Sequence, residues 1–472
     1  MGLSERFYAG LPVWGQHAAV SAYGAWWHWV RFGPGYREAL AGYRARERWS
    51  PERWREWTEA RLKSVLATAA DTVPHYRDTW SAGEREAARQ GRLERLPLLD
   101  KEPLRADPGA FLRQDMRVWH PLAFDTSGST GTPVRTYWTP PEYREALAVR
   151  EVRSANWAGV SFGEPRATFS GRIVEPDPAS SGPFHRFNVV ERQVYFSAFH
   201  LGPATAPAYV DALRRHRVRW ITGYAVSCYL LARHMVERGL GTPDLRAVVT
   251  TSEKVTPAMR RVMEAGFGCP VFEEYSTVEN IVFASECERG RLHVSPDVSV
   301  VEILDADGRP CPSGQPGEVV ATSLSRLYQP FVRFRLGDLA AWAREPCPCG
   351  RALPVLEGVI GRIEDVLVGP DGREMVRFHG VFVDQPHIRE GQVIQEGLDL
   401  IRVKVVPAPG FGPDDVRDVE SRIRQRLGDV RVEVDVVDDI PRAPSGKFVA
   451  VVSRLNRSDP DAFTPSAEDG SA

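Results

Sequence analysis

The chain of 472 residues is long enough for more than one domain, and its 43% hydrophobic and 26% charged residues are typical of a globular protein with large cores. Its 60 basic and 62 acidic residues give a net charge of −2, which argues against a nucleic-acid partner because such binders carry a basic excess. Six cysteines are too few for a disulfide framework. With no signal peptide and no apolar run of about 18 residues, we expect a cytoplasmic protein without a membrane span.

Residues 1–100 are predicted to be a helical N-terminal region of a large domain. Ser50 followed by Pro51 is a typical helix start, and apolar residues then recur at helical spacing. Upstream, residues 18–32 carry Trp26, Trp27 and Trp29 but are interrupted by His28 and Arg31. We expect this segment to pack against the main domain; the alternative is a helix that lies on a membrane surface.

Residues 218–275 alternate between short apolar stretches and longer amphipathic ones. We predict strands at 218–222, 246–250 and 270–275, and helices at 226–238 and 257–265, the latter with Thr256 as N-cap. This alternation predicts a parallel sheet covered on both faces, with ligands at the carboxyl ends of its strands. The segment 273–279 falls at such an end.

From residue 298 the pattern becomes antiparallel. Predicted strands at 298–304 and 318–323 flank a turn at 305–308, and stretches at 331–334 and 339–342 continue a barrel-like piece. A small α+β domain is predicted at 364–455, with a hairpin turn at Asp371-Gly372, strands at 400–406 and 430–436, and a helix at 413–427. The polar tail at 456–472 is expected to be disordered.

The stretch at 126–133 concentrates hydroxyl side chains and glycines. Glycine lets the backbone approach an anion closely, and successive N–H groups can turn toward one phosphate. An ordinary polar turn has a similar composition, so the stretch by itself leaves both interpretations open. It is not a Walker A loop, because no Gly-Lys-Ser/Thr follows.

Five stretches occur in a defined order: 126–133, 275–279, 333–338, 361–365 and 441–447. This order resembles the adenylate-forming (AMP-binding) superfamily, and within it the phenylacetate–CoA ligases and their capsular-polysaccharide-type branch. The resemblance extends from about residue 50 to 455. It implies an α/β fold with a large N-terminal domain at 101–363, containing parallel sheets plus the barrel-like piece, and a small mobile C-terminal domain.

The resemblance assigns nucleotide-binding roles residue by residue. It implies that Tyr275 lies beside adenine, that Asp338 accepts hydrogen bonds from both ribose hydroxyls, and that Arg362 reaches ribose or phosphate. The matching phosphate-loop residues are Thr126, Ser127, Gly128, Ser129, Thr130 and Gly131.

Catalytic roles follow in the same way. The resemblance implies that Glu279 holds Mg²⁺, that Thr277 lies near the α-phosphate, and that Lys447 bridges the acyl carboxylate and the α-phosphate. Glu364 and Asp365 match the hinge about which the small domain rotates.

The chain departs from the family pattern in two places. The segment 275–279 lacks the glycine that many relatives carry after the tyrosine, which leaves the pose of Tyr275 open. Phe334 and Leu336 stand where relatives often have Tyr and Thr.

A cysteine pair, Cys347 and Cys349, is matched upstream by Cys287 and His293. Together they offer three thiolates and one imidazole, a ligand set that suits tetrahedral Zn²⁺. Cys-x-Cys is tighter than the usual zinc spacing, so a plain turn is the alternative.

The predicted activity is an ATP- and Mg²⁺-dependent ligation of a carboxylic acid through an acyl-adenylate, followed by transfer to a thiol such as CoA. Acid-pocket candidates are 195–200, 223–225 and 250–254, whose aromatic residues favour an aryl or otherwise planar acid. Alternative acceptors are a carrier protein or an amine. An alternative of another class is a nucleotide-binding assembly partner without turnover.

Overall fold

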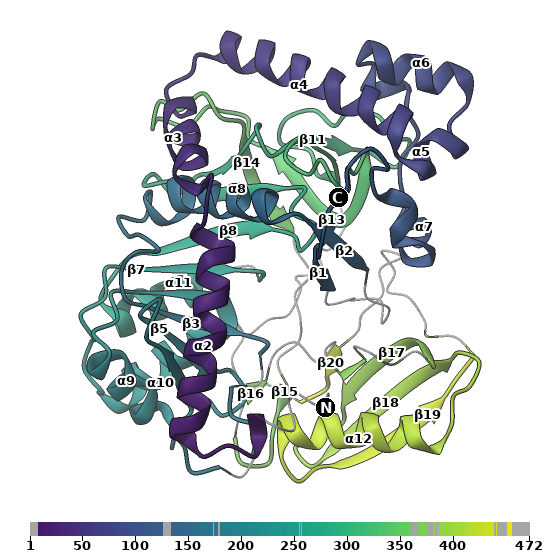
Figure 1. Ribbon diagram of the computed structural model, residues 1–472. Coiled ribbons are helices and arrows are strands. Elements are labelled where there is room, and N and C mark those ends of the chain that lie inside the picture. Colours follow the sequence, from purple (N-terminus) through teal and green to yellow (C-terminus); the bar gives the residue numbers. More distant parts are fainter. Residues whose placement is uncertain are drawn as a thin grey trace, which may run out of the picture.

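The computed structural model describes residues 8–455 except 126–133, 173, 178–179, 254, 256, 361–366, 373, 376–380, 383–384, 386, 439 and 441–450. Figure 1 shows a large domain built on one broad sheet, and a small domain that carries α12 and a second sheet. The predicted fold class, α/β with a smaller C-terminal α+β domain, is confirmed.

Residues 8–100 are mainly helical, as their pattern predicts. Ser50 caps α4, because its side chain accepts a hydrogen bond of 3.3 Å from the backbone N–H of Arg53. The elements are α2 (Val13–Phe32), α3 (Tyr36–Arg46), α4 (Pro51–Thr72), α5 (Pro74–Thr79), α6 (Ala82–Gln90), η1 (Leu93–Arg95), α7 (Lys101–Ala106) and η2 (Pro108–Phe111).

The tryptophan-rich segment forms α2, which packs against the large domain. Its inner face buries Trp27 and Val30, and a Cβ on Gly24 would lie 2.3 Å from the side-chain nitrogen of Asn188 on the neighbouring strand. Within the described chain, no helix is long and apolar enough to cross a bilayer.

Three histidines lie at the junction between α2 and the large domain. The ring of His17 on α2 lies 5.9 Å from that of His185, whose Nε2 lies 3.2 Å from Nε2 of His216. Burial lowers the pKa of all three, that of His185 to about 3. At neutral pH the cluster is therefore uncharged.

These histidines predict a loss of stability at mildly acidic pH. A base whose pKa is depressed in the folded state stabilises the fold above its unfolded pKa of about 6.5, and this stability is lost as the pH falls below that value. Between pH 7.5 and 5.5, His185 alone should cost about 1 kcal/mol of unfolding free energy. Denaturant titrations of the wild type and of His185→Gln test this: the variant should show the shallower pH dependence, and equal slopes would contradict the assignment.

The large domain is organised around a sheet of twelve strands in the order β11-β12-β13-β14-β10-β9-β8-β7-β6-β3-β5-β4. Five neighbouring strands of this sheet pair in parallel: β5, β3, β6, β7 and β8. All other pairings in the sheet are antiparallel. The antiparallel strands thus continue the parallel ones in a single sheet. The strands are β3 (Arg166–Ser170), β4 (His185–Asn188), β5 (Gln193–Ser197), β6 (Trp220–Tyr224), β7 (Ala247–Thr251), β8 (Val271–Ser276), β9 (Phe283–Glu286), β10 (Leu292–Val294), β11 (Ser299–Leu304), β12 (Gly317–Ser323), β13 (Phe334–Trp342) and β14 (Val355–Ile360).

One strand prediction is wrong. The stretches at 331–334 and 339–342 do not form two strands, because 334–342 is the single strand β13 and 331–333 precede it. Arg333 adopts a left-handed φ of 47°, and its guanidinium donates to the backbone oxygen of Leu96 and to Glu302. Gly337 lies within β13 and takes a left-handed φ of 76°. Glycine adopts this conformation without steric cost, so the strand continues through a position where the sequence suggests that it ends.

Helices cover both parts of the sheet. α9 (Ala206–Arg215), α10 (Ala225–Arg238) and α11 (Pro257–Phe267) share one hydrophobic core with the parallel strands. α8 (Pro140–Arg150), with its π-helical continuation η3 (Glu151–Ala155), packs with α3. The helices at 51–106 pack against the antiparallel strands.

The small domain contains a four-stranded sheet in the order β19-β18-β17-β20, with α12 packed against it. Its helix and two of its strands lie where the sequence predicts them, whereas β17 was not predicted. The elements are β15 (Leu367–Val368), β16 (Glu374–Met375), β17 (Ile388–Gln395), β18 (Leu400–Pro407), α12 (Pro413–Leu427), β19 (Arg431–Val436) and β20 (Val451–Ser453).

Candidate active site

The carboxyl end of β8 leads into a tight turn that displays two polar side chains. The N–H of Asn280 donates to the backbone oxygen of Thr277 at 3.0 Å, and Asn280 takes a left-handed φ of 51°. The hydroxyl of Thr277 is buried without a hydrogen-bond partner, and among the described residues nothing is bonded to the carboxylate of Glu279. An unpartnered buried hydroxyl is costly in a folded protein, so both groups are available to a ligand.

Tyr275 and Asp338, which are 63 residues apart in sequence, meet in the structure. The hydroxyl of Tyr275 at the end of β8 donates to Oδ2 of Asp338 on β13 at 2.9 Å. The bond joins the parallel and antiparallel parts of the sheet at this point. A carboxylate is an acceptor with about four lone-pair sites, so the bond from Tyr275 orients Asp338 without using all of its oxygens.

The hydroxyl-rich stretch at 126–133 lies outside the described residues, but the two strands that it connects are described. β1 (Leu122–Asp125) and β2 (Arg135–Trp138) pair antiparallel, with Asp125 opposite Arg135. The same two residues form an ion pair of 2.9 Å. The ends of the stretch are therefore held together by the backbone ladder and by this ion pair.

Arg326 links these strands to the turn at the end of β8, and sequence reasoning missed it. Its guanidinium is fully buried and donates to the backbone oxygen of Glu279 at 2.6 Å and to that of Tyr137 on β2. It also stacks over the ring of Trp138 at 3.8 Å. Burial lowers the pKa of Arg326 to about 10, while the carboxylates of Glu142 and Glu279 favour its charged form. The guanidinium therefore fixes Glu279 relative to the base of the 126–133 stretch.

The acid-pocket candidates have mixed outcomes. Phe196 is fully buried in the core, and both ring nitrogens of His200 are partnered, by Ser197 and by the backbone oxygen of Asp177, each at 2.8 Å. Glu253 accepts the N–H of Val226 at 2.9 Å and so satisfies the start of α10. Tyr195 and Tyr224 stay half-buried.

The remaining predicted site residues lie outside the described part of the chain. They are Thr126, Ser127, Gly128, Ser129, Thr130, Gly131, Arg362, Glu364, Asp365 and Lys447. The helix N-cap expected at Thr256 and the pocket candidate Lys254 also lie outside it. Their roles stay predictions.

A second cluster of side chains lies away from this site. The ligand atoms of Cys287, His293, Cys347 and Cys349 all lie within 4.8 Å of one another. The Sγ atoms of Cys287 and Cys347 are 3.7 Å apart, and Sγ of Cys349 is 3.4 Å from Nε2 of His293. A tetrahedral zinc ion with bonds of about 2.3 Å to sulfur requires sulfur atoms about 3.8 Å apart, so the spacing fits.

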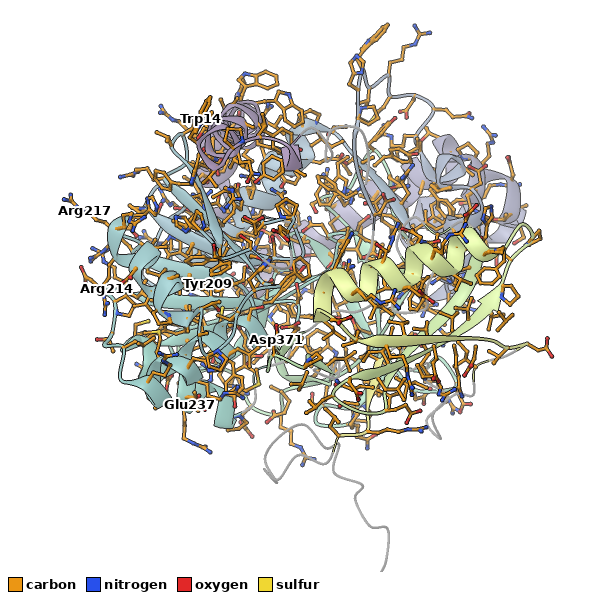
Figure 2. All side chains as sticks on the ribbon, turned by 90° about the horizontal axis from the view of Figure 1, so that it is seen from below. Trp14, Tyr209, Arg214, Arg217, Glu237 and Asp371 are labelled. Carbon is orange, nitrogen blue, oxygen red and sulfur yellow. The ribbon has the colours of Figure 1, made fainter. Side chains whose placement is uncertain are left out.

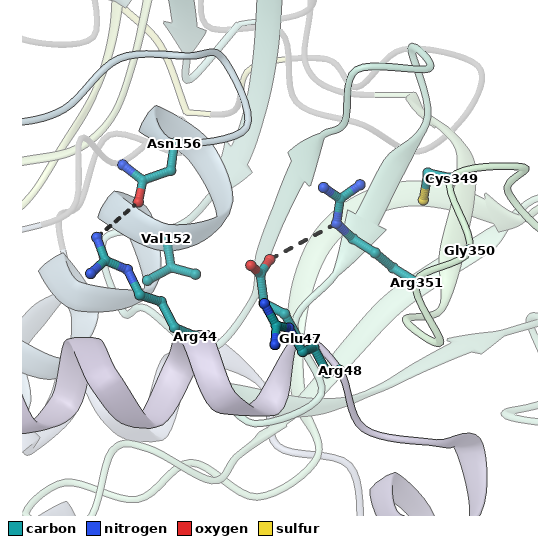
Figure 3. A pocket seen from close by; sticks show the side chains of 8 residues that line it. All are labelled: Arg44, Glu47, Arg48, Val152, Asn156, Cys349, Gly350 and Arg351. Carbon is teal, nitrogen blue, oxygen red and sulfur yellow. Dashed lines mark hydrogen bonds and ion pairs between the residues drawn. The ribbon is translucent and has the colours of Figure 1, made fainter.

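The surroundings of this cluster also suit a metal. Nδ1 of His293 lies 3.4 Å from the backbone oxygen of Leu353, which leaves Nε2 for a metal, and burial lowers the pKa of His293 to about 4, so the ring is neutral. Figure 3 shows a pocket beside the cluster, lined by Cys349, Arg351 and, among others, Arg44 on α3. Its volume is about 570 Å³. This pocket offers a path by which an ion can reach Cys349.

Comparison with known proteins agrees with this architecture. Residues 369–454 match the family model of the CapK C-terminal domain. Protein CapK of Staphylococcus aureus is 22% identical over 75% of this chain and 79% of its own length. A phenylacetate-coenzyme A ligase of Thermus thermophilus is 26% identical over 67% of this chain and 72% of its own length.

A solved structure shares the fold. The crystal structure of 2-hydroxyisobutyryl-CoA ligase, in complex with 2-HIB-AMP and CoA, superposes with a TM-score of 0.57 at 22% identity, over 87% of this chain and 92% of that one. The chain thus has the fold of the adenylate-forming acyl-CoA ligases. Its relatives are CapK and the phenylacetate–CoA ligases, and the family resemblance expected from the five motifs is confirmed.

Proposed function

We propose that this protein is an ATP- and Mg²⁺-dependent carboxylic acid ligase that forms an acyl-adenylate and passes the acyl group to CoA. The observation that carries the proposal is the Tyr275–Asp338 bond beside the buried Thr277 hydroxyl, which has no hydrogen-bond partner among the described residues, and beside the buried Glu279. The CoA ligases among the relatives support both half-reactions.

Each of the described site residues contacts a different part of the nucleotide. Asp338 is oriented by Tyr275 and accepts the ribose hydroxyls, while the hydroxyl of Thr277 donates to the α-phosphate. Glu279 would hold Mg²⁺, whose charge offsets that of the phosphate oxygens. The stretch at 126–133 would bind the β- and γ-phosphates, which leave as pyrophosphate.

Three residues outside the described part complete the proposal. The acid carboxylate attacks the α-phosphorus, the bond to pyrophosphate breaks, and the ammonium of Lys447 stabilises the charge on the transition state. The small domain then rotates about Glu364 and Asp365, so that a thiolate can attack the acyl carbon and release AMP.

The acid is proposed to be aryl or otherwise planar, because Tyr195 and Tyr224 are the aromatic pocket candidates that remain half-buried. The hydroxyl of Tyr224 accepts the N–H of Gly171 at 2.7 Å, so this ring has a fixed position. A carrier protein or an amine remains the alternative acceptor of the acyl group. The alternative of another functional class is a nucleotide-binding assembly partner that catalyses no reaction.

Exchange of labelled pyrophosphate into ATP tests the first half-reaction. A panel of aryl, amino and fatty acids should show exchange with aryl acids, followed by CoA-dependent AMP release. If the acid supports exchange but AMP is released only when an amine or a carrier protein is added, that compound and not CoA is the acyl acceptor. A folded, ATP-binding protein without exchange on any acid would favour the role without turnover.

We also propose that Cys287, His293, Cys347 and Cys349 bind a structural zinc ion. Cys287 follows β9 and His293 lies on β10, whereas both other cysteines lie in the loop between β13 and β14. The ion would therefore cross-link two segments about 60 residues apart. All four positions are filled by protein side chains, which is typical of structural sites and leaves no open position for catalysis.

Replacement of one ligand should release the zinc and lower stability. Cys349→Ser is expected to reduce bound zinc from about one per chain and to lower the melting temperature by several degrees. Cys311→Ser is the control, because Cys311 lies outside the cluster and hydrogen-bonds the backbone oxygen of Pro316. Metal analysis of wild-type protein purified without chelator that finds no zinc would reject the site.

A further inference from the structure

The outer face of α2 is an apolar surface fixed firmly to the molecule. The inner face is held by a hydrogen bond from the N–H of Phe187 to His17 at 2.9 Å and by one from Arg186 to Gln16 at 2.6 Å. Figure 1 shows α2 in front of the large domain, and Figure 2, turned by 90°, shows it at the outer edge with Trp14 labelled. The helix therefore presents its outer face in one orientation.

Exposed hydrophobic side chains concentrate on α2 and on the turn beside it. Of the twelve large hydrophobic side chains exposed in the described part of the chain, five belong to α2 and two, Val189 and Val190, follow the adjacent β4. The N–H of Val189 bonds Oγ of Ser21, which places this turn beside the helix. The five on α2 are Val13, Trp14, Tyr23, Trp26 and Trp29, with exposed fractions of 37%, 75%, 56%, 47% and 59%.

The exposed apolar area of α2 lies in the upper part of the range that monomers leave open. With about 200 Å² for a whole aromatic side chain, the four rings alone expose roughly 500 Å². Typical monomers leave patches of about 300–600 Å². The exposed valines and alanines add to this area, and one partner in a stable complex buries roughly 800 Å².

The face also lacks charge. α2 contains no Asp, Glu or Lys, and its single arginine, Arg31, forms an ion pair of 2.8 Å with Glu191. Two copies of such a face can meet without repulsion between like charges, and without leaving a buried charge unpaired.

The order of residues along the outer face is symmetric. Trp14, Ala18, Ala22, Ala25 and Trp29 follow one another at spacings of four, four, three and four residues, so they form one stripe on the helix, and all five are exposed. Large rings stand at both ends and small residues in the middle. When the helix is laid antiparallel on its own copy, Trp14 meets the partner copy's tryptophan at the far end of the stripe, and the alanines allow the axes to approach to about 8 Å.

From these observations we propose that the protein forms a two-fold symmetric dimer in which α2 packs antiparallel against α2 of a second copy. A two-fold interface requires a surface that complements itself, and the symmetric stripe provides one. The aromatic rings are already ordered, since Trp26 contacts Trp27 with ring centroids 4.9 Å apart, so little side-chain entropy is lost on association.

Sedimentation velocity on the full chain at micromolar concentrations tests the dimer. The wild type should sediment at twice the mass of one chain. Ala22→Arg places a charge at the centre of the stripe and should raise the dimer dissociation constant at least 100-fold. Ala60→Arg, at an exposed position of α4, is the matched control and should remain dimeric.

Cross-linking tests the antiparallel register. Because Ala22 lies next to the two-fold axis, Ala22→Cys should form a disulfide-linked dimer under mild oxidation, whereas Ala60→Cys should not. A monomeric wild type overturns the proposal, and if that monomer co-sediments with phospholipid vesicles, the face belongs to a bilayer instead. A dimer that survives Ala22→Arg overturns it as well.

Discussion

Lys447→Ala is expected to reduce acid-dependent ATP–pyrophosphate exchange by about 10²- to 10³-fold, the usual effect of removing one charge-stabilising group from a transition state. Both the attacking carboxylate and the α-phosphate are anionic, so without the ammonium their approach is opposed by repulsion. The KM for ATP should change little, because the phosphates, ribose and adenine are assigned to other residues.

Lys404→Ala provides the control for this variant. Lys404 lies on β18 of the same small domain and is partly exposed. Its replacement removes the same charge from the domain and should leave exchange unchanged. If Lys447→Ala adenylates the acid at the wild-type rate, the role of Lys447 is refuted, and with it the idea that the small domain contributes to the first half-reaction.

Glu279→Gln should lower the adenylation rate by about 10²-fold while the protein stays folded. The substitution keeps the side-chain volume and removes the charge that would hold Mg²⁺, so the remaining activity should need a higher magnesium concentration. Because the Glu279 carboxylate also favours the charged form of the buried Arg326, which Glu142 still supports, the neutral amide should lower the melting temperature by a few degrees at most.

Two measurements separate function from folding for Glu279→Gln. Thermal denaturation should give a single transition within a few degrees of the wild type, while magnesium titrations of exchange should show the weakened site. Glu264→Gln, on the exposed side of α11, should change neither. A Glu279→Gln enzyme with wild-type rate and magnesium dependence would remove Glu279 from the metal site.

The sequence identified the residues whose chemistry follows from side-chain type and order. Tyr275 and Asp338 were assigned to one nucleotide site from their place among five motifs, and the structure brings them within 2.9 Å. The Cys/His cluster was named in the same way. It is assembled because β10 and β14 pair, with His293 opposite Val355.

Other features could not be predicted from the sequence, because the groups that they contact leave no pattern in it. Arg326 acts on two backbone carbonyls, which every residue possesses, so nothing marks this arginine among the sixty basic residues. β4 was missed since it buries His185 and Arg186 and therefore lacks the apolar run that predicts an interior strand. Its arginine is paired with Glu175 and Gln16, which come from distant segments.

The position of Arg326 has a consequence for how related ligases can diverge. Its guanidinium joins the turn that carries Glu279 to β2. Within the described part of the chain, its hydrogen bonds and ring contacts involve neither β5 nor β6, which carry the acid-pocket candidates. On the proposed assignment of Tyr195 and Tyr224 to the acid pocket, substitutions there are expected to change the acid that is accepted while the ATP-binding residues stay in place. Such an enzyme can evolve toward a new acid substrate through single substitutions in the acid pocket, each of which leaves the residues for the ATP-dependent step unchanged.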